Sequence, residues 1–222
     1  MVAELRYAVR TVPDRWILPE GKVPESRPHD LASERFRDQL EAWVERTGRD
    51  AQVARNLAVR WDRARPRIGV DPDVCLIEPT PPERDDLTSL CAWKAGHSVP
   101  CFALEIVSIG HPYKDYAESP DKYAACGVEE LAIFDPLLAG PLVGGGPHLL
   151  QSWQRDGSGA FARVYAGPGP ARSAVLGAWL HVEGEKWLRV SDDEAGANQW
   201  LTREEAALRR VAELEAELVR LK

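Results

Sequence analysis

The sequence lacks the cysteine and histidine spacing that a zinc site requires. Its four cysteines form no Cys-x-x-Cys pair, and no His-x-x-x-His motif follows them. Cys75 and Cys126 lie in apolar runs, where a cysteine behaves as a small buried hydrophobe. The five histidines also show no ligand spacing, and we expect most of them on the surface or in loops. A zinc ion is therefore not expected.

The sequence also lacks a long uninterrupted apolar segment. Met1–Tyr7 carry no apolar stretch after their charges, so a signal peptide is not expected. The most apolar window, 131–150, is broken by Asp135, Pro136 and Pro141, so it is not expected to cross a membrane. We therefore expect a protein of the cytoplasm with no membrane partner.

An excess of positive charge is the third absence. The formal net charge is -7, whereas proteins that grip nucleic acid by their general field are basic. A local basic groove around a metal site remains compatible with this charge. The three glycines at 144–146 are followed by no Lys-Ser or Lys-Thr, so a nucleotide-binding loop is not supported either.

What is present is the composition of a globular protein, with 44% hydrophobic and 28% charged residues in 222. Residues 1–30 are rich in proline and charge and predict an extended arm. Residues 31–200 predict one domain, and residues 201–222 predict a terminal helix. Thr202 and Glu205 form a capping box at the start of that helix.

The terminal helix also carries the seam of a short coiled coil. Val211, Leu214, Leu218 and Leu221 follow a 3-4-3 spacing. Two heptads are too short to be stable alone. We therefore expect this helix to pack on its own domain or on a second subunit, as in a homodimer.

The central segment alternates helix and strand patterns, which predicts a mixed α/β fold. Apolar residues recur at helical spacing over 33–46, and Gly48 ends that helix. Near-continuous apolar runs over 70–77, 102–107 and 128–134 predict strands covered on both faces. A looser alternation over 53–61 predicts a further strand, and 78–98 predicts a loop or lid.

A short helix is expected between the second and third buried strands. Ser119 fits its N-cap, Pro120 its first position and Gly127 its C-terminal stop. Strand, helix and strand in this order predict a right-handed parallel crossover. Short amphipathic strands then predict C-terminal β-hairpins, one of them turning at Asp156-Gly157. Their ranges are 149–154, 161–165, 174–180 and 187–190.

Two carboxylates on the buried strands are the main candidates for chemistry. Strand alternation places Asp73 on one face with Cys75, and Glu105 on one face with Ala103 and Val107. An ionised carboxylate among apolar atoms is costly unless it is paired or bound to metal. A divalent cation would explain keeping both acids, although a turn role for Asp73 and a structural salt bridge for Glu105 are the plainer alternatives.

Lys122 is the candidate lysine. It lies in the first turn of the helix expected just after the strand of Glu105, so its side chain could turn back over that carboxylate. A helix N-terminus disfavours a cation by ~0.3–1 kcal/mol. The alternative is an ordinary solvated lysine beside Asp121.

The order of these motifs resembles the Uma-two family of endonucleases, from about residue 30 to the end. The motifs are Pro72-Asp73, Glu105-Ile106-Val107-Ser108, Asp115, Lys122-Tyr123, Gly127-Val128-Glu129-Glu130, Asp135-Pro136, Asp156-Gly157 and Leu176-Gly177. The resemblance implies a restriction-endonuclease-like (PD-(D/E)XK) core, with a mixed central sheet flanked by helices. It also implies Mg²⁺, with Mn²⁺ as a substitute, held by Asp73 and Glu105, and DNA as the substrate.

The resemblance also concerns the lysine and a further acid. The fold usually keeps a lysine two residues after the second acid, where this chain has Val107. In the resembling family a lysine of the next helix is thought to replace it, and Lys122 matches that place. A helix acid often completes the site, and either Glu34 or Glu41 could serve. Ile109-Gly110-His111 departs from the family's usual Pro-Ser-Thr.

Three functions follow as hypotheses. The first is a Mg²⁺-dependent endonuclease in which Asp73, Glu105 and Lys122 are catalytic. The second is a nuclease-fold interaction module with little or no catalysis, dimeric through its last helix, which the acidic charge and the altered loop after Ser108 favour. The third is a metal-dependent hydrolase of another phosphoester.

Overall fold

The structure is a computed structural model and describes residues 27–110, 112–142, 146–184 and 186–221. Most of the arm expected over 1–30 lies outside these ranges, as does His111. The first described helix, α1 (Arg27–Thr47), begins within the last residues of that expected arm and six residues before the helix predicted over 33–46. Gly48 follows it in a left-handed conformation, as expected of a helix stop.

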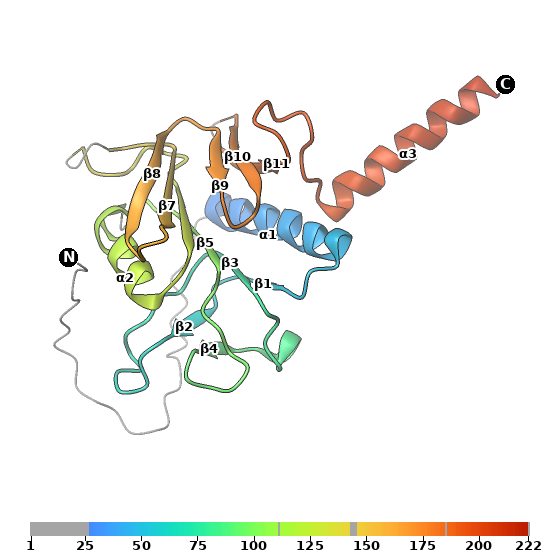
Figure 1. Cartoon of the computed structure of the whole chain (residues 1–222). Helices are drawn as coiled ribbons and strands as arrows, with labels where there is room; N and C mark the ends of the chain where they lie inside the picture. The colour runs from blue at the N-terminus through green and yellow to red at the C-terminus, as the bar shows by residue number, and fades with distance from the viewer. Residues whose placement is uncertain (1–26, 111, 143–145, 185, 222) are drawn as a thin grey trace.

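A mixed six-stranded sheet is the centre of the described fold (Figure 1). Its strand order is β1-β3-β5-β6-β7-β8. The β5–β6 pair is parallel and the other neighbours are antiparallel, so the predicted parallel crossover is confirmed. The strands are β1 (Gln52–Ala54), β3 (Val74–Ile77), β5 (Phe102–Ile106), β6 (Glu130–Phe134), β7 (Leu150–Arg155) and β8 (Phe161–Gly167).

Two smaller sheets complete the strands of the described residues. One is antiparallel, in the order β11-β10-β9, and the other is the parallel pair β2-β4. Their strands are β2 (Ala58–Arg60), β4 (Ser89–Cys91), β9 (Ala171–Ser173), β10 (Ala178–Glu183) and β11 (Trp187–Ser191). A single 3-10 turn, η1 (Arg84–Asp86), precedes β4. The mixed α/β fold class predicted from the sequence is confirmed.

Several predicted strand limits are wrong. The strand expected over 53–61 is divided between β1 and β2, which belong to different sheets. The strand expected over 174–180 is interrupted by a turn at 174–177, where Gly177 has a left-handed φ of 67°. The loop expected over 78–98 contains β4. The pairs β1–β3 and β2–β4 join segments that are far apart in the sequence, and such pairing is not visible in local alternation.

The helix after β5 begins earlier than expected. A π turn, η2 (Lys114–Glu118), runs directly into α2 (Ser119–Cys126), so Ser119 is inside a helical segment and is not an N-cap. Gly127 ends α2 with a φ of 94°, as predicted. This early start changes which side chains of the helix face β5.

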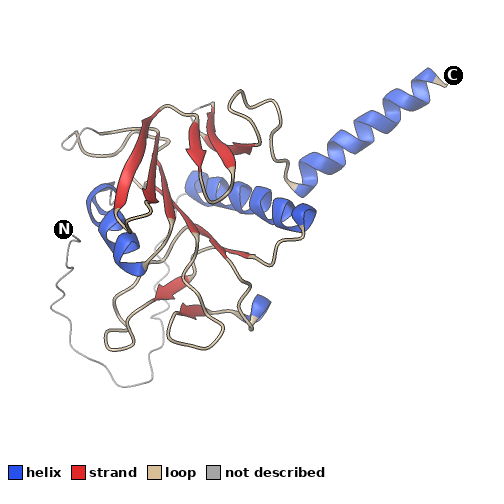
Figure 2. Ribbon diagram, in the orientation of Figure 1, coloured by secondary structure: helices blue, strands red, loops and turns tan. Residues whose placement is uncertain are grey.

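The sheet has a hydrophobic core on each face, and Figure 2 shows α1 and α2 with the strands between them. Phe36 and Leu40 of α1 pack on Val74, Leu104 and the strands β9–β11. Burying one such side chain contributes about 1.5–3 kcal/mol. The second core contains Cys75 and Ala103 of the opposite face, together with Tyr123 and Cys126 of α2.

The last helix, α3 (Arg203–Arg220), projects away from the body (Figure 1). The predicted capping box of Thr202 and Glu205 is present at its start. Glu205 also accepts hydrogen bonds from Arg35 and Arg189, which hold the first turn on the domain. Beyond that turn, the apolar seam expected of a coiled coil is exposed. No described helix is long and apolar enough to cross a membrane.

Candidate active site

Asp73 and Glu105 lie opposite each other on neighbouring strands. Val74 of β3 pairs with Leu104 of β5, so one step further the antiparallel register sets Asp73 against Glu105. The two residues are 8% and 3% exposed. Cys75 and Ala103, which lie on the same face of their strands as Asp73 and Glu105, belong to the α2-side core. Asp73 thus shares a face with Cys75 and Glu105 with Ala103, as predicted, and the strand register brings the two acids onto one face of the sheet.

Asp73 is held by the backbone of the strand beside it. The backbone N–H of Ile106 donates to Asp73 Oδ2 over 2.6 Å. His29 Nε2, from the first turns of α1, lies 3.2 Å from the same oxygen and 3.0 Å from the Ile106 carbonyl oxygen. The Asp73 carboxylate therefore caps the end of the β3–β5 pairing, and it is not a simple turn residue.

Glu105 is the most strongly perturbed acid of the site. Its Oε1 accepts a 2.7 Å hydrogen bond from Tyr123 Oη of α2. Burial, together with the charges of Asp73 and Asp115, raises the pKa of Glu105 to about 8, although Lys114 and the Tyr123 hydrogen bond act in the opposite direction. A salt bridge that fully offsets the Glu105 charge is therefore not what this structure shows.

Asp115 is a third buried carboxylate, which we did not predict as a site residue. It lies in η2, is 4% exposed and accepts a hydrogen bond from the Ser119 hydroxyl. Burial and the charge of Asp73 together raise the pKa of Asp115 to about 6, against the effect of Lys114. Asp115, Ser119 and Tyr123 are spaced four residues apart, and this spacing in the sequence indicates a helix that begins before Ser119.

The lysine beside these carboxylates is Lys114 and not Lys122. Lys114 Nζ lies 3.8 Å from Glu105 Oε2 and 3.8 Å from Asp115 Oδ1. The charge of Glu105 is the largest cause of a raised Lys114 pKa, so the ammonium form is favoured. Lys122 Nζ instead bonds Glu118 one turn earlier, at 2.8 Å. The expected position of Lys122 over Glu105 is therefore wrong, because the helix starts before Ser119.

The acids expected from the first helix do not reach the site. Glu34 is exposed, and Glu41 pairs with Arg37 and with Arg203 at the start of α3. The α1 side chain that reaches Asp73 is His29, which we had expected on the surface or in a loop. Its contact crosses 44 positions of sequence, and no local spacing reports such a contact.

Magnesium suits the donor set of this site better than zinc does. Within the described ranges, no group of three or more His, Cys, Asp or Glu side chains could hold a metal ion. Magnesium is usually bound by only one or two carboxylates, with waters and substrate phosphates completing its octahedron. Asp73 and Glu105 supply two such carboxylates, and the raised pKa of Glu105 shows that a nearby positive charge would be favourable.

The chain is similar to a known protein family and to a solved structure. The model of the Uma2 family, described as a putative restriction endonuclease, matches residues 7–139. A crystal structure of a putative nuclease from Anabaena variabilis ATCC 29413 is similar, with a TM-score of 0.47 and 11% sequence identity, over 69% of this chain and 75% of that one. No curated protein matches the chain.

A mixed sheet that presents paired acids, together with the family match, defines a protein of the restriction-endonuclease-like class. Because the match covers more than half of the chain, the protein belongs to the Uma2 family of putative restriction endonucleases. The resemblance stated from the sequence is thus confirmed, although the match begins within the arm and ends before β7.

Proposed function

We propose that this protein is a Mg²⁺-dependent endonuclease that hydrolyses phosphodiester bonds of DNA. One observation carries the proposal: two buried carboxylates face each other across β3 and β5, and a third, Asp115, raises their mutual repulsion. Repulsion of this kind lowers stability, so a bound cation is a physical reason for keeping all three acids.

Asp73 and Glu105 would hold the ion, and Mn²⁺ would substitute for Mg²⁺. When bound, such an ion polarises a scissile phosphate and lowers the pKa of an attacking water. The chain prepares this site by fixing each carboxylate from a different element. Ile106 N–H orients Asp73, and the Tyr123 hydroxyl orients Glu105. Carboxylates that are already held in place need little reorganisation when substrate binds.

Lys114 takes the role that we had expected of Lys122. Its ammonium group lies against Glu105 and Asp115 and is about half exposed, so it can also reach a bound phosphate. There it would orient the water or offset negative charge in the transition state. The charges of Glu105 and, less strongly, Asp115 favour the ammonium form of Lys114.

Calorimetric titration of Mg²⁺ and Mn²⁺ tests the metal site, with wild type compared with Asp73→Asn and Glu105→Gln. Cleavage of plasmid and of single-stranded DNA tests the activity. We expect wild type to bind the ion and to cut, and both variants to lose binding and cutting together. Wild type that binds neither ion would contradict the site. If the protein binds the ion and cleaves a small phosphodiester but cleaves no DNA, the result would favour a hydrolase of another substrate.

We also propose that α3 joins two copies of the chain. The side chains of its seam are exposed by 42% to 79%, which is costly for a helix that stays single in water. This observation is also the one that favours the second candidate function, a dimeric interaction module without catalysis. The seam residues are Val211, Leu214, Leu218 and Leu221.

Light scattering tests this dimer. We expect Leu214→Lys with Leu218→Lys to halve the mass, whereas Val219→Lys, an exposed change outside the seam, leaves it unchanged. If the wild-type protein is a monomer, the dimer is excluded, and with it the dimeric interaction module. A dimer that binds metal but cuts nothing would favour the module over the nuclease.

A further inference from the structure

Residues 61–68, which we call the arginine loop, form a basic segment on an acidic protein. The loop connects β2 to the strand segment that leads to Asp73, and it reads Trp-Asp-Arg-Ala-Arg-Pro-Arg-Ile. Arg63, Arg65 and Arg67 are exposed and are opposed within the loop by Asp62 alone, whereas the whole chain has a net charge of -7. A local positive charge of this kind is what an acidic protein needs to contact a polyanion.

The arginine loop is built to hold its charges outward. Pro66 and Ile68 are buried and alternate with the exposed Arg65 and Arg67. Two successive backbone turns order the segment, because Arg65 N–H donates to the Asp62 carbonyl over 3.0 Å and Ile68 N–H donates to the Arg65 carbonyl over 2.9 Å. The arginines therefore come from an ordered surface loop whose alternate residues are anchored in the core.

A buried arginine closes the loop at its base. Arg60 Nη1 donates to the carbonyls of Val59 and Val70, at 2.9 and 3.1 Å, and so joins the two ends of the loop. Its Nη2 lies 3.0 Å from Asp71 Oδ1. Gly69 leaves room for this clamp, since a Cβ there would collide with the Arg60 side chain. The loop is thus fixed in position relative to Asp71.

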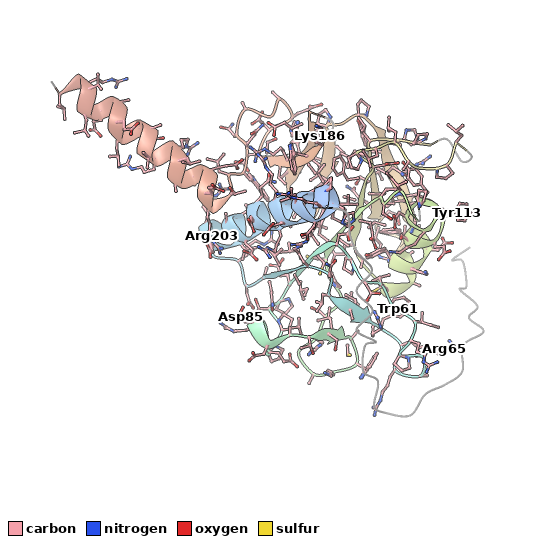
Figure 3. All side chains as sticks on the ribbon, turned by 180° about the vertical axis from the view of Figure 1, so that it is seen from behind. Trp61, Arg65, Asp85, Tyr113, Lys186 and Arg203 are labelled. Carbon is pink, nitrogen blue, oxygen red and sulfur yellow. The ribbon has the colours of Figure 1, made fainter. Side chains whose placement is uncertain are left out.

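The base of the arginine loop adjoins the candidate active site. Asp71, whose Oδ1 lies 3.0 Å from Nη2 of the clamping Arg60, is only two residues before Asp73. Arg67 precedes Asp73 by six residues, which is at most about 20 Å of chain. In Figure 3, Trp61 and Arg65 lie along the same side of the molecule as Tyr113, which directly precedes Lys114.

We propose that the arginine loop binds the phosphate backbone of the nucleic acid on which the Asp73–Glu105 site acts. The inference rests on the proposed nuclease function and specifies how the substrate is held. Guanidinium groups match phosphate oxygens in geometry and charge. Contacts outside the metal site position a strand without reading its sequence, and they explain how an acidic protein can bind DNA at all.

Fluorescence anisotropy with a labelled duplex, measured over a range of salt concentrations in EDTA, tests the loop without requiring catalysis. The test variant is Arg65→Gln with Arg67→Gln. We expect its plot of log affinity against log salt to be shallower by about 2, and its affinity roughly tenfold or more weaker at low salt. Arg65→Lys with Arg67→Lys keeps the charges and should keep the wild-type slope.

Arg209→Gln with Arg210→Gln is the matched control, because it removes two exposed arginines from the projecting helix α3. We expect its slope to equal that of wild type. Thermal melting checks that every variant folds. We expect all of them to fold, because the four substituted arginines are exposed. If the salt dependence of the test variant and that of the control became shallower by the same amount, the change would reflect net charge only and would overturn the loop assignment.

The loop and the nuclease function fail in different ways. Wild-type cleavage with unchanged binding by the Arg65, Arg67 variant overturns the loop and leaves the nuclease. Salt-dependent binding that depends on the loop, with no cleavage under any ion, supports the loop and contradicts the nuclease. Tighter binding of the loop to anionic vesicles or to polyglutamate than to DNA would assign it to another partner and overturn the proposal.

Discussion

Tyr123 of α2 donates a 2.7 Å hydrogen bond to Glu105 of β5, so the crossover helix holds the carboxylate of the strand that precedes it. Tyr123 is fully buried, and this burial is the largest cause of its pKa lying above the usual range. The charge of the Glu105 carboxylate raises the Tyr123 pKa further. The contact joins the fold to the site: the same helix that covers the sheet orients one of its acids.

Removal of this hydroxyl should weaken metal binding and stability together. In Tyr123→Phe, Glu105 loses a bond to its charged form, so its pKa rises further and the site competes less well for a cation. The unsatisfied carboxylate should cost about 1–3 kcal/mol, or a few degrees in melting temperature. Calorimetry and thermal melting measure both. Tyr113→Phe, the same change at a 64% exposed tyrosine, should alter neither.

Glu105 should make the metal-free protein less stable as the pH rises. The pKa of Glu105 is raised to about 8 in the folded protein, from an ordinary 4.5. Between these values the folded protein keeps a proton that the unfolded chain has released, so the free energy of unfolding falls as the pH rises through this window, by a few kcal/mol. Asp115 acts in the same direction between 3.8 and about 6.

Urea unfolding in EDTA at about pH 5, about pH 6.5 and about pH 8 measures this slope. Glu105→Gln should flatten it and should melt no lower than wild type at the highest pH. Added Mg²⁺ should stabilise wild type most at the highest pH, where the acids are ionised. A variant with the wild-type slope would show that another group titrates.

Lys114, and not Lys122, should be required for cleavage. Loss of a group that offsets transition-state charge typically costs about 10²–10³-fold in rate. We therefore expect that loss in Lys114→Met, whereas Lys122→Met stays close to wild type because its partner is Glu118. Plasmid-nicking rates at saturating Mg²⁺ decide between them. The reverse result would restore the assignment made from the family resemblance.

Glu130 should be a structural carboxylate and not a catalytic one. It is fully buried in β6, and its Oε2 accepts the backbone N–H groups of Ala174 and Val175, which fixes the turn between β9 and β10. Glu130→Met leaves both donors unsatisfied and should cost about 2–4 kcal/mol. Chemical denaturation measures this loss, with the exposed neighbour Glu129→Met as the control. Metal affinity should not change in either variant.

Local periodicity predicted much of the fold and the two site residues Asp73 and Glu105. Alternation along 70–77 and 102–107 set Asp73 with Cys75 and Glu105 with Ala103, and the strand register of the structure places the two acids opposite each other. Helical spacing of Phe36, Leu40 and Trp43 indicated the buried face of α1. These features depend on side-chain direction within one element, and direction follows from backbone geometry alone.

The remaining site residues depended on how distant elements meet. His29 reaches Asp73 only because α1 crosses the sheet near the end of β5. Lys114 replaces Lys122 because η2 extends the helix toward the strand, so that residues before the expected helix start face Glu105. The His29 contact leaves no mark in local spacing, because it arises from packing between segments that are far apart. The four-residue repeat of Asp115, Ser119 and Tyr123 does indicate the early start of the helix, but it does not show that Lys114 would lie beside Glu105.

The sequence by itself therefore determined the class of fold, the two buried acids as candidates, the parallel crossover and the capped last helix, whereas the β3–β5 register set these acids against each other. The tertiary structure alone decided which lysine and which helix residue join the acids, and that burial raises the pKa of Glu105 to about 8. The physical reason is the same in each case: a backbone pattern sets where a side chain points, whereas its charge state and its neighbours are set by every segment packed around it.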